Sequence, residues 1–269
     1  GMGVSAFTGL ICQGNYVENV GDAGIKSQGN NELVRYNNVT RFCQKTTDRA
    51  AYYNFIEINV VTDTSFNKVW EYNFASNGYG DLTGTPQQNS TSPENRCAGF
   101  YMDGRNEGDT LRFNVTWNVP GGGFSLNIDS FVYCYGNLNV LWDSISRYRN
   151  ATGVRIQQLR NYQIKFFSYT NNTNYVFLST QKQLKYTAAS QSPASIIGNF
   201  KAIGTIDNNY YNMVTIANYQ TEAGTPFGYG NYNHSQFVST FGFGSQDIQL
   251  PNYPYAQCLF LKNWSPQGR

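Results

Sequence analysis

Short runs in which apolar and polar residues alternate recur along this chain. Four of them begin with a glycine: Gly24-Ile-Lys-Ser27, Gly99-Phe-Tyr-Met-Asp103, Gly123-Phe-Ser-Leu-Asn127 and Gly153-Val-Arg-Ile-Gln157. Strict alternation is typical of a β-strand with one buried face. The last three of these glycines lie 24 and 30 residues apart, with no helical pattern between them. The chain is therefore predicted to be all-β and built from a repeating unit.

Each glycine-led run is followed by a second β-rich run that carries an asparagine or a substitute. Asn38 lies 14 residues after Gly24, Asn114 lies 15 after Gly99, and Ser168 takes the same place 15 residues after Gly153. A period of about 20–30 residues with two or three short strands is typical of a β-solenoid, whose stacked turns bury a common core. Asparagine tolerates left-handed turns and can hydrogen-bond to its copy in the next turn. We predict that Asn38 and Asn114 occupy equivalent buried bends.

With these matched glycines and asparagines, residues 5–190 resemble the right-handed parallel β-helix family, the pectate-lyase-like superfamily with its asparagine ladder. That superfamily includes polysaccharide lyases, polygalacturonase-like glycoside hydrolases and phage tailspikes. The resemblance implies a right-handed parallel β-helix of about seven coils. The chain carries no catalytic signature of the family. An antiparallel jelly roll, a β-sandwich, is the alternative fold, because any β-rich chain contains alternating runs.

The repeat fades after about residue 190, which predicts two regions. Residues 5–190 form the parallel β-helix coils, and residues 191–269 form a β-rich C-terminal extension or cap with strand-like runs at 213–216, 236–240 and 257–261. No capping helix fits before Gly9. An open coil exposes core and unpaired strand edges, so we expect a neighbouring domain or a second copy in a homo-oligomer to cover the N-terminal coil.

The composition excludes several classes of function. Charged residues make up 13% and aromatic residues 16% of the chain, and the net charge is +2 without a basic run, so nucleic acid is not an expected partner. No apolar stretch approaches the ~20 residues needed to cross a bilayer, so no membrane partner is expected. The single histidine, His234, and five cysteines without metal spacing exclude a multi-histidine zinc site. We expect unpaired thiols, no metal site and no cofactor, except Ca²⁺ if the chain is a lyase.

Aligning the lead glycines places Ile25, Phe100, Phe124, Val154 and Val176 inward, in the core, and the outward side chains in columns on one sheet face. Amide, carboxylate and tyrosine groups in such columns suit a hydroxyl-rich polymer, although an exposed strand face is polar in any case. The first column contains Lys26, Glu57, Tyr101 and Arg155, the second contains Asp103, Asn127 and Gln157, and the strand ends add Arg105 and Asp129. We predict that Lys26, Tyr101, Arg105, Asn127 and Gln157 bind substrate, and that Asp103, Asp129, Glu57 and Arg155 are catalytic.

Two carboxylates on this face have a spacing that suits glycoside hydrolysis. Asp103 and Asp129 would lie one rung apart and two residues offset, which gives roughly 8 Å between them. An inverting glycosidase places its acid and base ~6.5–9.5 Å apart, with a water beside the sugar. Glu57 could replace Asp129 if its coil packs directly against that of Asp103.

A polysaccharide lyase is the main enzymatic alternative. In a lyase, a cation held by carboxylates neutralises the uronate, and Arg155, Arg105 or Lys26 would abstract the proton. The pattern thus predicts a secreted, cell-surface or virion protein that binds a polysaccharide or glycan, with cleavage left open. The alternative is a non-catalytic structural or adhesion fibre segment whose tyrosine-rich tail contacts a subunit or receptor.

Overall fold

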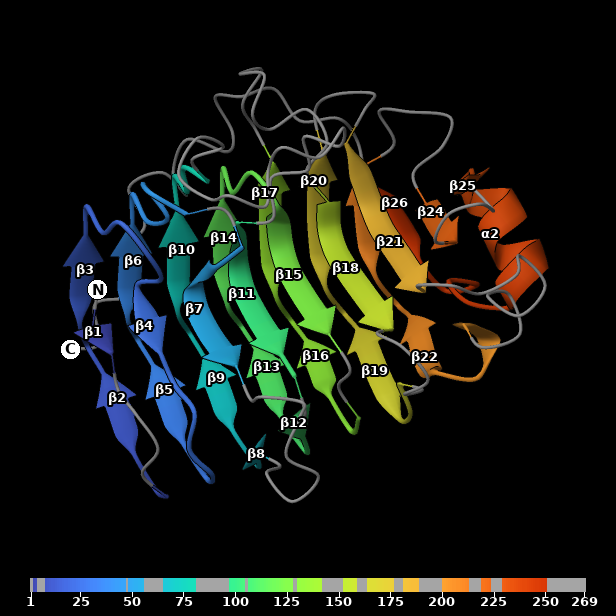
Figure 1. The fold of residues 1–269 in the computed structure, drawn as a ribbon. Helices are drawn as coiled ribbons and strands as arrows, with labels where there is room; N and C mark the ends of the chain where they lie inside the picture. Colours follow the sequence, from blue (N-terminus) through green and yellow to red (C-terminus); the bar gives the residue numbers. More distant parts are fainter. Residues whose placement is uncertain are drawn as a thin grey trace.

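The chain is built mainly from short strands in three sheets that run side by side from the N-terminal to the C-terminal part of the molecule (Figure 1). The computed structural model describes residues 2–3, 8–46, 48–55, 65–80, 97–104, 106–127, 130–141, 152–158, 164–176, 181–188, 200–212, 219–223 and 229–250. Consecutive strands enter the seven-, eight- and nine-stranded sheets in turn, and three such strands make one coil. This order is consistent with a parallel β-helix.

The strands of each sheet follow in order along the stack. The nine-stranded sheet contains β1 (Met2–Gly3), β4 (Ile25–Lys26), β7 (Ala50–Phe55), β11 (Ala98–Asp103), β15 (Gly122–Asn127), β18 (Thr152–Gln158), β21 (Lys182–Ala188), β24 (Tyr219–Ala223) and β25 (Tyr229–Tyr232). The seven-stranded sheet contains β2 (Ile11–Gln13), β5 (Leu33–Arg35), β9 (Val69–Glu71), β13 (Thr110–Arg112), β16 (Tyr133–Tyr135), β19 (Phe167–Thr170) and β22 (Gly204–Asp207).

The eight-stranded sheet completes each coil. It contains β3 (Tyr16–Glu18), β6 (Asn38–Thr40), β10 (Phe74–Ser76), β14 (Val115–Trp117), β17 (Leu138–Leu141), β20 (Thr173–Val176), β23 (Tyr210–Asn212) and β26 (Ile248–Leu250), and a two-stranded sheet pairs β8 (Ser65–Phe66) with β12 (Asn106–Glu107). Among the described strands, only the pair β24–β25 is antiparallel. The parallel pairing of the other described strands rules out the antiparallel jelly roll for the described part of the chain.

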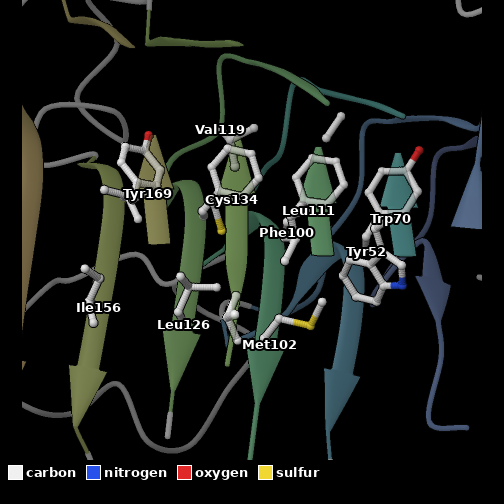
Figure 2. Packing of buried hydrophobic residues seen from close by; sticks show 14 of the residues in the cluster. Tyr52, Trp70, Phe100, Met102, Leu111, Val119, Leu126, Cys134, Ile156 and Tyr169 are labelled. Atoms are coloured by element: carbon white, nitrogen blue, oxygen red, sulfur yellow. The ribbon is translucent and has the colours of Figure 1, made fainter. Parts of the chain in front are cut away.

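The core follows the predicted alternation. Phe100 pairs in register with Phe124, and Phe124 with Val154, and all three are buried. Tyr52 stacks on Phe100 with ring centroids 4.7 Å apart. Figure 2 shows how side chains of the nine-stranded sheet meet those of the seven-stranded sheet, such as Trp70, inside the coil. Val176 is the exception to the prediction, because it belongs to β20 in the eight-stranded sheet.

The lead glycines lie where two sheets approach closely. A Cβ atom on Gly24 would come within 2.3 Å of Val39 Cγ1, and one on Gly99 within 2.5 Å of Thr116 Cγ2. The register aligns Gly24, Gly99, Gly123 and Gly153, as predicted, and places Ala51 at the same position in β7. A small residue is required there because side chains of the eight-stranded sheet fill the space.

An asparagine ladder crosses the turn between the seven- and eight-stranded sheets. The backbone N–H and the side-chain amide of Asn114 both donate to Asn137 Oδ1, at 3.0 and 3.1 Å, and the same amide donates to the Trp70 carbonyl at 2.8 Å. The residue before each rung is left-handed, as at Phe113 with a φ of 55°. Within the described residues, the rungs are Asn15, Asn37, Asn73, Asn114, Asn137, Asn172 and Asn209, and Asp247 is the last acceptor.

The predicted ladder position is right at Asn114 and wrong by one residue at Asn38. Asn38 begins β6 and pairs with Phe74, and the rung is its neighbour Asn37. Ser168 lies within β19 and is not a rung. The error arises because the distance was counted from the lead glycine, across a turn of variable length. The constant spacing is two residues after the preceding strand, as in Arg112-Phe113-Asn114.

The parallel coils continue beyond residue 190. β22, β23 and β24 extend the three sheets, so the region predicted as an extension begins with further coil. The run at 236–240, predicted as a strand, belongs to helix α2 (His234–Phe241). Asn233 and Gln236 form a capping box at its start, and Phe237 and Phe241 pack into the core cluster. The runs at 213–216 and 257–261 lie outside the described residues.

The helix α2 covers the C-terminal end of the stack (Figure 1). Its Phe241 lies edge-on to Phe200, and Phe200 stacks on Tyr186 with ring centroids 4.5 Å apart. Aromatic side chains thus close the core at this end, as an open coil requires.

Within the described ranges, no helix is long and apolar enough to cross a membrane.

The four described cysteines are buried and no disulfide joins them, as expected. They are Cys12, Cys43, Cys97 and Cys134. Cys258 lies outside the described residues.

Three charged side chains occupy one buried column at the N-terminal ends of strands in the seven-stranded sheet. Glu32, Lys68 and Asp109 each precede a strand and are at most 1% exposed. Lys68 Nζ donates to Asn106 Oδ1 at 3.0 Å and lies 3.4 Å from Asp109 Oδ2. Burial raises the pKa of Glu32, and it raises the pKa of Asp109 to about 6 despite the nearby Lys68. Burying these charges costs free energy that their pairing only partly offsets.

We predict that Asn114→Ala lowers the free energy of unfolding by about 1–3 kcal/mol, because it leaves buried ladder groups without partners. Asn38→Ala is the matched control, since Asn38 lies one residue off the ladder, and it should cost clearly less. Urea unfolding followed by far-ultraviolet circular dichroism measures both. Equal losses in the two variants would contradict the assignment of the ladder.

The protein should become more stable on acidification through Asp109. Folding raises its pKa from 3.8 to about 6, so the stability from its protonation is fully present below pH 3.8 and is lost as the pH rises through 6. This group should contribute about 3 kcal/mol to the rise between neutral and acid pH. Asp109→Asn, tested with Asp109→Asn/Lys68→Met so that no lysine stays buried alone, should remove that slope. An unchanged slope in both variants would show that Asp109 does not titrate in this range.

Candidate functional site

The outward face of the nine-stranded sheet brings the predicted residues together in part. Its first column reads Lys26, Tyr53, Tyr101, Ser125, Arg155 and Lys185. Lys26, Tyr101 and Arg155 therefore share one column, as the aligned glycines predicted. Each comes from a different coil, so the stacking of coils alone brings them into line.

The predicted place of Glu57 in this column is wrong, because Tyr53 pairs in register with Tyr101. The prediction aligned the run at 55–58 with the glycine-led strands, whereas Ala51 takes the place of the glycine. Glu57 itself lies outside the described residues, and so do Arg105 and Asp129.

The second column reads Phe55, Asp103, Asn127, Gln157 and Thr187. Asp103, Asn127 and Gln157 thus lie on consecutive coils, as predicted. Asn127 Nδ2 donates to Asp103 Oδ1 at 2.9 Å. The pairing of Asp103 with Asp129 is not tested, because Asp129 is not described.

Four side chains from three coils form a hydrogen-bonded group that we call the Asp103 cluster: Tyr53, Tyr101, Asp103 and Asn127. The Tyr53 hydroxyl donates to Asp103 Oδ2 at 3.0 Å. Asn127 Nδ2 donates to the Tyr101 hydroxyl at 2.6 Å, in addition to its bond to Asp103. Both oxygens of the carboxyl group therefore accept hydrogen bonds from neighbouring coils.

Burial sets the electrostatics of the cluster. It raises the pKa of Asp103, against the lowering effect of the hydrogen bonds from Asn127 and Tyr53, and the negative charge of Asp48 raises that pKa further. Burial also raises the pKa values of Tyr53 and Tyr101. A carboxyl group with a raised pKa is suited to donate a proton, and the tyrosines stay neutral hydrogen-bonding groups at ordinary pH.

Charged side chains that the sequence pattern did not indicate lie beside the cluster. Arg49 Cζ lies 5.0 Å from the centre of the Tyr53 ring, and Arg49 Nε lies 3.2 Å from Asp22 Oδ1. Lys26 Nζ lies 2.5 Å from Asp22 Oδ2. Lys26, predicted to bind substrate, is thus held by a carboxylate. Recognising Ala50-Ala51 as the substitute for a glycine would have placed Tyr53 and Arg49 on this face.

The face is more enclosed than an open groove. Tyr101 is 4%, Asn127 3% and Arg155 9% exposed. These side chains are accessible only in part, so a ligand would reach them at a few points. Within the ranges that the structure describes, no three His, Cys, Asp or Glu side chains gather in a way that could hold a metal ion.

Comparisons of the chain with protein-family models, with curated protein sequences and with solved structures give no match.

Replacing Tyr53 with phenylalanine should raise the pKa of Asp103 further, because the hydroxyl that stabilises the carboxylate is lost. Tyr101→Phe is the control, since its hydroxyl bonds to Asn127 and not to the carboxylate, and it should change this pKa less. Carbon-detected NMR titration of the Asp103 side chain measures the shift. A lower or unchanged pKa in the Tyr53 variant would show that the hydrogen bond does not form.

Proposed function

We propose that the chain is a right-handed parallel β-helix of the pectate-lyase-like kind that binds a polysaccharide on the outward face of the nine-stranded sheet. The observation that carries this proposal is the Asp103 cluster, in which hydroxyl, amide and carboxyl groups from three coils converge. Such groups match the donors and acceptors of a sugar. A secreted, cell-surface or virion location goes with this function.

Cleavage of the bound polymer is part of the proposal, with Asp103 as the proton donor. Its raised pKa keeps a larger share of the group protonated near neutral pH than an exposed aspartate would keep. Asp129 follows Asn127 by two residues in the sequence and is the proposed base. In a lyase reaction, Arg155 would abstract the proton instead, and carboxylates would hold Ca²⁺.

A non-catalytic fibre segment is the second candidate, and the burial of the cluster favours it. Asp103 has both oxygens engaged by neighbouring coils, and Tyr101 is only 4% exposed. A buried polar group whose hydrogen bonds are all made within the protein fixes the register of the coils without contacting a ligand. In this case the cluster holds the sheet together, and ligand contacts lie elsewhere.

The variant Asp103→Asn separates the two candidates. For a hydrolase, it should abolish turnover while leaving glycan binding nearly intact, because the proton donor acts on the transition state. A panel of acidic and neutral polysaccharides, assayed for new reducing ends and for the ultraviolet absorbance of unsaturated products, measures hydrolysis and elimination. Glu18→Gln is the control, since this carboxylate pairs with Arg41 on the eight-stranded sheet.

If the parent chain binds a polysaccharide but cleaves none of the panel, the cleavage part of the proposal is wrong and the chain is a binding protein. Equal turnover in Asp103→Asn and the parent would rule out Asp103 as the acid. Loss of binding as well as turnover in Asp103→Asn, with an unchanged melting temperature, would show that this side chain contacts the sugar directly.

A further inference from the structure

The face of the seven-stranded sheet differs from the enclosed face of the nine-stranded sheet, because large apolar side chains are exposed on it and at its two ends. Tyr133 on β16 is 44% exposed and Ile11 on β2 is 61% exposed. Clusters of exposed apolar side chains mark interaction surfaces more often than scattered ones do. The exposed group comprises Ile11, Phe66, Tyr72, Phe113, Phe131, Tyr133 and Phe166.

A row of polar side chains runs along this face at the C-terminal ends of its strands. The register aligns Gln13, Arg35, Glu71, Arg112 and Tyr135 on consecutive coils. Arg112 donates to Glu71 Oε2 at 2.7 Å and to the Tyr135 hydroxyl at 2.9 Å. We call these five side chains the arginine row.

The arginine row carries a surplus of positive charge. Glu71 is only 8% exposed and is neutralised by Arg112, whereas Arg35 lies 4.0 Å from the same carboxylate. The side chains of Arg35 and Arg112 are 35% and 36% exposed. The row therefore exposes two guanidinium groups to solvent, whereas its one carboxylate is largely buried. This net positive charge is complementary to an anion.

A stack of aromatic rings borders the row on the next residue of each coil. Tyr36, Tyr72 and Phe113 stack with ring centroids 5.3 and 5.1 Å apart. Arg35 Cζ lies 5.6 Å from the centre of the Tyr36 ring, so the guanidinium group and the stack belong to one surface. The stack thus adds an apolar wall to the row, at the spacing of the coils.

We propose that the arginine row and the aromatic stack form a second binding surface that takes a linear polysaccharide bearing carboxylate groups. The Arg35 guanidinium group binds the carboxylates, while Arg112, whose fork already holds Glu71, adds positive charge. Gln13 and the Tyr135 hydroxyl bind sugar hydroxyls. The repeat of the row from coil to coil suits a polymer that lies along the stack.

A second copy of the chain fits this surface less well. In a two-fold pair centred on Glu71, residues of one copy meet the same patch of the other in reverse order. Arg35 would then face Arg112, and Glu71 would face Glu71. This like-charge arrangement disfavours self-association and favours an acidic ligand.

The test compares binding of polygalacturonate with that of its methyl-esterified form, using the full chain and isothermal titration calorimetry. The parent should bind the acidic polymer at least about tenfold more tightly, and its affinity should fall with salt. Arg35→Gln should weaken binding about fivefold or more, because an exposed charge-assisted contact is lost. Arg41→Gln removes the same charge away from the row, where Arg41 pairs with Glu18, and should stay within about twofold of the parent.

Several outcomes would overturn the proposal. Absence of binding, equal binding of the two polymers, or equal losses in Arg35→Gln and Arg41→Gln would each do so. A change of oligomeric state in Arg35→Gln, measured by sedimentation velocity, would identify a second copy as the occupant. The proposal does not depend on the Asp103 cluster: loss of binding in Asn127→Ala but not in Arg35→Gln would support the nine-stranded face and refute this surface.

Discussion

The fold depends on one repeated problem, the tight turn that each coil makes between the seven- and eight-stranded sheets. The turn buries backbone N–H groups that no strand can reach, and a buried donor without a partner costs about 1–3 kcal/mol. In Asn73 and Asn114 one side-chain oxygen accepts both the backbone and the amide hydrogens of the rung before it. Because each rung completes its neighbour, the register of the stack is fixed at this corner.

Once the register is fixed, every other position along a coil becomes a column, and each column has its own chemistry. Phe100 and its partners form a stack of core rings, while Tyr101 and Arg155, one step along the strands, face outward. The same rule aligns Lys68 with Asp109 inside the coil and Arg35 with Glu71 outside it. Function in such a protein is therefore a property of columns, and a single side chain acts through the copies above and below it.

The sequence predicted the parallel coil, the inward rings and the grouping of Asp103 with Asn127, because glycine and alternation are set by close packing of neighbouring sheets. The prediction from sequence failed where a residue of another type, or at another position, took the structural role of the expected one. Ala51 replaces a lead glycine, so Tyr53 was missed and Glu57 was placed in its column. The rung Asn37 was mistaken for Asn38 because the turn before the strand varies in length. Phe237 was assigned to a strand, although a capping box starts a helix there.

The ladder has a direction, and Asp247 is its last acceptor in the part of the chain that the structure describes. Its Oδ1 accepts the backbone N–H of Asn209 at 2.7 Å, and its own N–H bonds to Gly244 within the same segment. An aspartate side chain can accept this hydrogen bond but has no NH₂ group to donate to a further rung. The exchange of one NH₂ group for an oxygen thus leaves Asp247 without a side-chain donor for a further rung. Hydrolysis of the amide at an inner rung, the ordinary ageing reaction of asparagine, would convert that asparagine to aspartate. The ladder would then be interrupted in the middle of the molecule.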